Sequence, residues 1–84
     1  MLTVYAVSWC PHCVAMVEFL KEINIEYRYV DMDSADPETE KAVIKVNGGT
    51  DWVVPTLECG GKWIKGKSFS RKQAEKDLKE LGLL

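Results

Sequence analysis

The sequence lacks several features that define other classes of protein. No apolar run is longer than a few residues, so no segment is long enough to cross a membrane as a helix. The formal net charge is only −2, which argues against general nucleic-acid binding. There is one histidine, and the three cysteines are an odd number, so at least one of them is unpaired within a monomer. We therefore expect neither a membrane nor a nucleic acid among the partners.

What is present is an ordinary composition in a short chain. The 84 residues are 46% hydrophobic and 29% charged, which is enough for one small domain, residues 1–84, with a marginal core. The residues from Met1 to Tyr5 begin directly as a strand and lack the basic and apolar regions of a signal peptide. We expect a cytoplasmic monomer, in a compartment where a close cysteine pair is more often catalytic than structural.

Charge is distributed unevenly along the chain. Acidic residues dominate between Glu18 and Asp51, whereas basic residues dominate between Lys62 and Lys79. The basic segment has two interpretations. It is either a solvated face or a positive rim for an anionic thiol or an acidic partner.

Hydrophobic periodicity predicts alternating strands and helices. Strands are expected at residues 2–7, 25–30, 56–59 and 62–65, and the first helix at Pro11 to about Glu22, with Val14, Val17 and Leu20 facing inward. The first two strands should pair in parallel through a right-handed crossover. The order βαβαββα predicts an α/β fold in which three helices flank a four-stranded mixed sheet.

Capping and turn residues mark where the other elements begin and end. Asp36 precedes Pro37 as the cap of a second helix, which Asn47-Gly48-Gly49 ends after an inner face of Ala42, Val43 and Val46. Ser70 and Gln73 form the pattern of a capping box before a last helix, which places Ala74, Leu78 and Leu81 on the core. Residues 31–36 read as a polar loop, and Gly60-Gly61 as a tight hairpin turn.

The most informative segment is Trp9-Cys10-Pro11-His12-Cys13, where the first strand gives way to the first helix. A Cys-x-x-Cys pair at this junction is a redox signature. Unpaired N–H groups and the helix macrodipole favour a thiolate at Cys10, and Pro11 suits the first helical position. We expect the Cys10 pKa to fall within about 3.5–7.5 and that of Cys13, one turn on, to stay near or above about 8.5.

Other interpretations of the cysteines remain open. Cys59 and His12 would nominally complete a Cys₃His zinc set with the pair, but His12 lies between the two cysteines and no second ligand pair exists. A purely structural disulfide across so short a loop would remove little chain entropy. Cys59 itself reads as a half-buried strand residue rather than a third redox partner.

These residues resemble the glutaredoxin family over nearly the whole chain. Cys10-Pro11-His12-Cys13 matches its dithiol site, and Val53-Val54-Pro55 resembles the Thr-Val-Pro segment in which the proline peptide is cis. The family's Gly-Gly-x-Ser-Asp turn falls on residues 65–69. There Gly66 and Ser68 match, whereas Lys65 and Phe69 stand in place of Gly and Asp. The resemblance implies a thioredoxin-like fold.

Some positions depart from the family pattern. Val7 replaces a lysine that many glutaredoxins carry, and Trp9 is typical of thioredoxins and of short actinobacterial redoxins. Asn47-Gly48-Gly49 resembles mycoredoxin, the glutaredoxin relative that works with mycothiol. The Cys-Pro-His-Cys sequence is similar to that of strongly oxidising thiol oxidases. His12 either favours the Cys10 thiolate electrostatically and raises the reduction potential, or it points into solvent.

The resemblance implies a thiol–disulfide oxidoreductase that reduces protein disulfides or protein–thiol mixed disulfides. Cys10 attacks, Cys13 resolves, and Pro11 and His12 tune the pair. The implied thiol-binding residues are Trp9, Trp52, Val53, Val54, Pro55, Lys65, Gly66, Lys67 and Ser68. Glutathione or another low-molecular-weight thiol is the expected co-substrate, with no tightly bound cofactor or metal.

The sequence leaves two alternative functions open. One is a dedicated electron-donor redoxin recharged by a flavin disulfide reductase such as thioredoxin reductase. The other is an iron–sulfur cluster or metal-binding module that uses Cys10 across a dimer, against which Pro11 argues mildly because cluster-carrying relatives often have a smaller residue there.

Overall fold

Strand β1 (Leu2–Ala6) is a central strand of the sheet. In the computed structural model, which describes residues 1–84, the strand order is β2-β1-β3-β4. β1 pairs in parallel with β2 (Tyr27–Asp31) and antiparallel with β3 (Thr56–Cys59), which in turn pairs antiparallel with β4 (Lys62–Ile64). The predicted four-stranded mixed sheet and its parallel first pair are confirmed.

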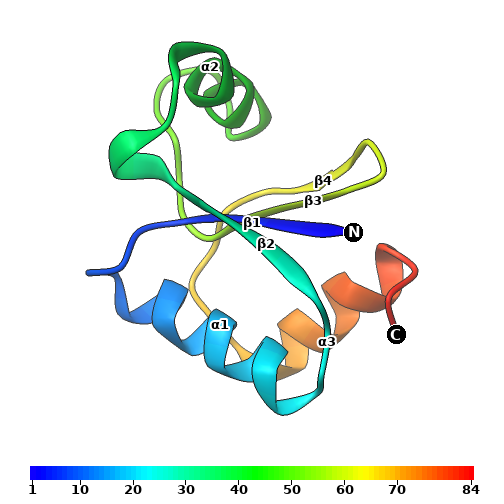
Figure 1. Ribbon diagram of the computed structural model, residues 1–84. Coiled ribbons are helices and arrows are strands. Elements are labelled where there is room, and N and C mark those ends of the chain that lie inside the picture. The colour runs from blue at the N-terminus through cyan, green and yellow to red at the C-terminus, as the bar shows by residue number, and fades with distance from the viewer.

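Three helices cover the two faces of this sheet. Figure 1 shows α1 (Pro11–Glu22) and α3 (Arg71–Glu80) on one face and α2 (Pro37–Val46) on the other. The predicted order βαβαββα is confirmed, with one addition. Residues Met32–Ser34 form a short 3-10 helix, η1, inside the expected polar loop, and Met32 is buried there. None of the helices combines the length and the apolar character needed to span a bilayer.

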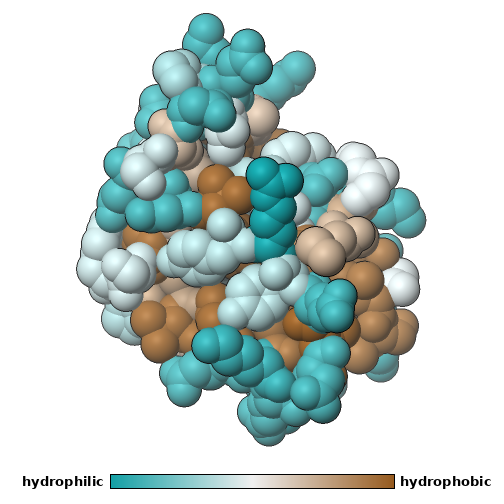
Figure 2. Space-filling view, viewed as in Figure 1, coloured by the Kyte–Doolittle hydropathy of each residue, from teal (hydrophilic) through white to brown (hydrophobic).

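The core lies mainly between the sheet and the pair α1 and α3. Alternate β1 side chains, those of Leu2, Val4 and Ala6, are fully buried and join a cluster of 15 buried apolar residues. On the opposite face of the sheet, Tyr5 stacks on Trp63 with ring centroids 5.4 Å apart. Figure 2 shows that hydrophilic side chains dominate the upper part of the visible face, over α2, and that apolar patches elsewhere are interrupted by polar ones.

Two predicted features differ from the structure: the buried face of α1 and the start of β2. α1 buries Cys13, Met16, Phe19 and Leu20, whereas Val14 is 45% exposed, so its predicted inner position was wrong. Cys13 lies one turn inside the helix and is packed into the core, which rotates Val14 outward. β2 begins at Tyr27 rather than at residue 25, because Asn24 adopts a φ of 58° and the Ile25 N–H donates back to Leu20 O.

The predicted caps are found, with one correction. Asp36 accepts a hydrogen bond from the Thr39 N–H at 2.8 Å, and Ser70 Oγ accepts one from the Gln73 N–H at 3.4 Å. The reciprocal half of the capping box is absent, because the Gln73 side chain donates instead to Asp77 at 2.9 Å. In the hairpin turn, Gly60 and Gly61 have φ values of 58° and 89°, which glycine tolerates.

Candidate active site

The dithiol turn is formed by the junction of β1 and α1. Cys10 is the N-cap of α1, with extended backbone angles (φ −94°, ψ 121°), and Pro11 occupies the first helical turn. The Cys10 carbonyl accepts hydrogen bonds from the N–H groups of Cys13 and Val14 at 3.0 and 3.1 Å. The helix therefore starts as predicted, with Cys10 half-buried at its end and Cys13 buried one turn behind.

The two thiols differ strongly in acidity. The backbone N–H of Cys13 has the largest effect on Cys10 and lowers its pKa below the ordinary value. The His12 N–H and the Cys13 thiol act in the same direction, against partial burial. Burial raises the pKa of Cys13 to about 11, and its hydrogen bond with Cys10 adds to the rise. The expected directions are confirmed: the sulfur at the helix end is the acidic one, and the buried sulfur keeps its proton.

Side chains flanking the cysteines are held from distant segments. Trp9 is 67% exposed, yet its Nε1–H donates to Asp33 Oδ2 at 2.7 Å, which fixes the ring from η1. His12 is also exposed, and its Nδ1 accepts a hydrogen bond from the Phe69 N–H at 3.0 Å. The ring of His12 thus contacts the segment 65–69. Neither of the two roles inferred from the sequence, support of the Cys10 thiolate or exposure to solvent, includes this contact.

The Val53-Val54-Pro55 segment leads into β3. Its Val54–Pro55 peptide bond is cis, as the resemblance implied. Pro55 is buried and shares a small cavity with Met16 of α1 and Phe69, whereas Val53 is 41% exposed. Trp52, which the resemblance implied to be a thiol-binding residue, is half-buried and packs against the core cluster.

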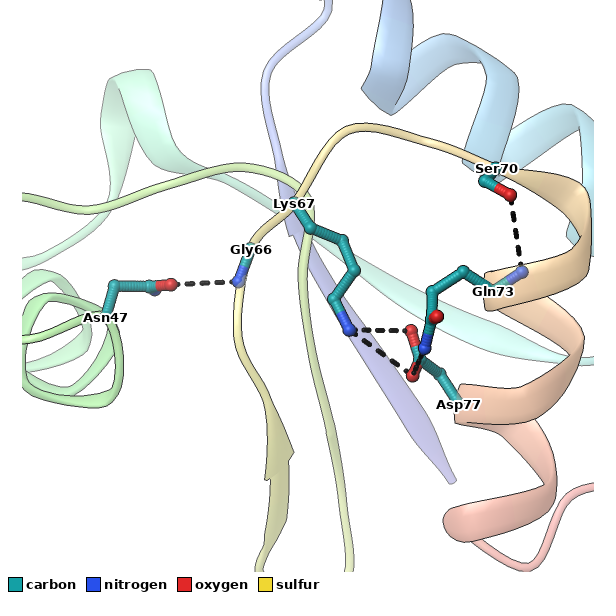
Figure 3. Close-up of polar contacts among 6 residues, drawn as sticks. All are labelled: Asn47, Gly66, Lys67, Ser70, Gln73 and Asp77. Atoms are coloured by element: carbon teal, nitrogen blue, oxygen red, sulfur yellow. Dashed lines mark hydrogen bonds and ion pairs between the residues drawn. The ribbon is translucent and has the colours of Figure 1, made fainter.

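The segment 65–69 is anchored by residues that were not predicted for the site (Figure 3). The Gly66 N–H donates to Asn47 Oδ1 at 2.8 Å. Lys67 Nζ contacts both carboxylate oxygens of Asp77, at 3.3 and 3.1 Å, so this lysine is engaged within the protein. Lys65 forms no ion pair, and Ser68 is exposed.

The sequence held only partial signals for these anchors. The sequence pattern marks Asn47 as a helix-ending residue and as a point of resemblance to mycoredoxin, but an asparagine amide also carries two donors and an acceptor. Asp77 lies on the inner face of α3, one position before Leu78, and is only 6% exposed. A carboxylate at such a position needs a partner, and Lys67 and Gln73 supply it.

Cys59 lies on β3, opposite Leu2 of β1, and is half-buried as expected. No group of three or more His, Cys, Asp or Glu side chains is placed to hold a metal ion. The four residues of the nominal Cys₃His set are therefore not assembled into one site.

A sequence model of the glutaredoxin family matches residues 2–64. The chain belongs to the glutaredoxin family. Mycoredoxin 1 from Corynebacterium glutamicum is 38% identical over 56 residues, covering 67% of this chain and 66% of mycoredoxin 1. The chain spans slightly less than two thirds of the length of the curated relatives that it matches.

Solved glutaredoxin structures share the fold. The glutaredoxin from Archaeoglobus fulgidus has a TM-score of 0.64 at 29% identity, covering 95% of this chain and 83% of that one. The buckwheat glutaredoxin–glutathione complex has a TM-score of 0.67 at 20% identity, covering 99% and 71%, a likeness that shows the fold alone. The thioredoxin-like fold is therefore established, and members of the glutaredoxin family are thiol–disulfide oxidoreductases.

Proposed function

We propose that this glutaredoxin-family protein reduces protein disulfides, and mixed disulfides between proteins and low-molecular-weight thiols, through Cys10 and Cys13. The observation that carries the proposal is the difference in acidity between two sulfurs one helical turn apart. The half-buried Cys10 has a lowered pKa, whereas the pKa of the buried Cys13 is about 11. A nucleophile must be a thiolate, and a resolving thiol has to stay protonated until it is needed.

The reaction proceeds in two exchanges. The Cys10 thiolate attacks one sulfur of the substrate disulfide and forms a mixed disulfide, while the other substrate sulfur leaves as a thiolate. Cys13 then transfers its proton to that thiolate or to water and attacks the Cys10 sulfur. The second substrate sulfur leaves, and a Cys10–Cys13 disulfide remains. Two electrons have passed to the substrate, and two molecules of a low-molecular-weight thiol, or a flavin disulfide reductase, return them.

The substrate would be bound by the segments around Cys10. Trp9 and Val53 offer exposed apolar surface, and the Val54 backbone next to Pro55 can pair with an extended peptide. Lys65 is the lysine free to meet a carboxylate of the thiol, together with the backbone of Gly66 and the Ser68 hydroxyl. Lys67 would have to leave Asp77 first. We propose that His12 anchors the segment 65–69 by accepting a hydrogen bond from the Phe69 N–H. We propose that Pro11 fixes the backbone angles of the first turn of α1.

Two low-molecular-weight thiols and one reductase are the candidate electron donors. Glutathione is the thiol in the complex of the buckwheat relative, and the match with mycoredoxin 1 brings mycothiol into consideration. Because Trp9 is typical of thioredoxins and short redoxins, thioredoxin reductase is the alternative electron donor. The test is reduction of one model disulfide with each of these three donors in turn. Turnover with either low-molecular-weight thiol supports the proposal, turnover with thioredoxin reductase alone favours the dedicated redoxin, and no turnover with any donor contradicts both.

A further inference from the structure

The side-chain amide of Asn47 joins the end of α2 to two segments further along the chain. Its Nδ2 donates to Val43 O at 2.9 Å, within α2, and to Thr56 Oγ1 at 3.0 Å, at the start of β3. Its Oδ1 accepts from the Gly66 N–H at 2.8 Å, as Figure 3 shows. Both donors and the acceptor of the amide are therefore used within the protein.

Thr56 and Gly66 extend this network to Val53. Thr56 is fully buried, and its Oγ1 donates to Val53 O at 2.6 Å while accepting from Asn47. A Cβ on Gly66 would lie 2.6 Å from both Val53 Cγ1 and Val53 O, so only glycine permits this approach. The segments 53–55 and 65–69 are thus in direct contact, and both are tied to the end of α2.

We propose that Asn47 is a positioning residue that sets the spacing of these two segments and thereby the KM for the disulfide substrate. The inference rests on the proposed function, in which the same two segments bind the substrate. Asn47 makes none of the contacts that lower the pKa of Cys10, which come from the backbone and side chain of Cys13 and from the His12 N–H. Its effect should therefore fall on substrate binding and leave the nucleophile unchanged.

The chemistry of the position calls for an amide rather than a carboxylate. Aspartate has the same shape, but when ionised it only accepts hydrogen bonds. In Asn47→Asp, a carboxylate oxygen would replace the amide nitrogen whose two N–H groups now donate to Val43 O and Thr56 Oγ1. The Gly66 N–H would keep its acceptor. The contact with Val43 O is therefore opposed, and Thr56 can meet the carboxylate only by turning its proton away from Val53 O, so the link to Val53 is lost without a change in volume.

The experiment measures kcat and KM for a glutathione mixed disulfide of a cysteine peptide, well below the thermal transition of each variant. We expect Asn47→Asp to raise KM about tenfold. The rate of Cys10 alkylation by iodoacetamide and its pH midpoint should stay within about twofold and a few tenths of a pH unit. Asn24→Asp is the matched control, because Asn24 also follows a helix, is exposed and forms no side-chain hydrogen bond. It should leave KM unchanged.

Thr56 supplies a second, independent pair of variants. Thr56→Val keeps the shape but removes the hydroxyl, and should raise KM several-fold, whereas Thr56→Ser should stay near the wild-type value. An unchanged KM in both Asn47→Asp and Thr56→Val, whatever the fall in Tm, would show that Asn47 only ends α2. A shift of the Cys10 alkylation midpoint as large as the change in KM would also overturn the proposal.

A readout that needs no turnover separates this inference from the proposed function. In Asn47→Ala the Gly66 amide loses its acceptor, so its hydrogen exchange, measured by NMR, should accelerate roughly tenfold or more. Unchanged exchange would refute the tether itself. A wild-type protein that exchanges no disulfide, with the Gly66 amide protected as expected, would instead refute the proposed function.

Discussion

The dithiol turn, residues 9–13, and the segment 65–69 are neighbours held in place by different means. The acidity of Cys10 comes mainly from main-chain N–H groups at the start of α1. The segment 65–69 depends instead on side chains that reach it from elsewhere, namely Asn47, Asp77 and His12. The acidity of Cys10 therefore follows from the backbone at the start of α1, whereas the position of the segment 65–69 depends on individual side chains from other parts of the chain.

The resemblance to glutaredoxins divides in the same way. Within the dithiol turn, Cys10 to Cys13 match the family's dithiol site and only Trp9 departs from the pattern, whereas the segment 65–69 keeps only Gly66 and Ser68. Substitutions in the turn should therefore affect every substrate alike, and those in the segment should affect binding or local stability.

Replacement of the nucleophile should have the largest effect. Cys10→Ser should lower disulfide reduction by roughly a thousandfold or more, because a serine hydroxyl is not ionised at neutral pH. Cys13→Ser serves as the comparison: it should still form a mixed disulfide through Cys10 but fail to release a reduced protein substrate. Mass spectrometry of the trapped species checks both. Retained activity in Cys10→Ser would remove the basis of the mechanism.

Burial of the second thiol should appear as a pH-dependent stability. In the reduced protein, the pKa of Cys13 is raised from its ordinary 9.0 to about 11, so the folded state holds a proton that the unfolded state has lost between these values. The stability from Cys13 is therefore full below about pH 9 and is lost as the pH rises toward 11. Its size is of the order of 2 kcal/mol.

Cys13→Ala should consequently flatten the fall in unfolding free energy between pH 9 and 11, measured by urea denaturation of reduced protein. The shift of Cys10 has the opposite sign. Its lowered pKa adds stability above about pH 9, which is lost as the pH falls through the folded pKa. Equal slopes in Cys13→Ala and the wild type would mean that the second thiol is not shielded as described.

His12 lies where the two regions meet. His12→Ala removes the acceptor of the Phe69 N–H, so hydrogen exchange of that amide should rise about tenfold. The reduction potential should move by less than about 30 mV, which is a tenfold change for this two-electron couple, because the groups that lower the Cys10 pKa are not part of the imidazole. A much larger shift would show that the ring acts on the thiolate electrostatically.

The smallest effect is expected at the ion pair beside α3. Lys67→Met leaves the Asp77 carboxylate, which is 6% exposed, with only Gln73 as a partner, and should lower the free energy of unfolding by about 1 kcal/mol. Lys65→Met is the matched control, since Lys65 forms no ion pair, and should change it by less than about 0.5 kcal/mol. Equal values from urea denaturation would show that the Lys67–Asp77 pair contributes nothing.

The sequence predicted the fold and the placement of Cys10 and Cys13 at the start of α1 because both depend on local signals. Alternation in β1, the caps Asp36 and Ser70 and the Gly60-Gly61 turn each involve residues close together in the chain. The Cys10 cap also belongs to this class. The sequence did not predict that Val14 is exposed. The stripe of Val14, Val17 and Leu20 fits helical spacing as well as the observed buried stripe of Cys13, Met16, Phe19 and Leu20 does.

The tethers could not be predicted in the same way. Asn47 contacts Gly66 across 19 positions, Trp9 contacts Asp33 across 24, and Phe69 contacts His12 across 57. A hydrogen bond between distant positions leaves no periodic trace in a sequence. Only Asp77 carried a signal, because its position next to Leu78 on the inner face of α3 indicates a buried carboxylate that needs a partner.

The hairpin between β3 and β4 offers a practical handle. Its tip points away from the start of α1 in Figure 1, and the space beside Gly60 and Gly61 is open, with no atom within 4 Å of a Cβ built on either residue. Loop tips of this kind tolerate inserted sequence. A short affinity tag placed between the two glycines would therefore attach the protein to a surface by the hairpin tip, away from the start of α1 that carries Cys10.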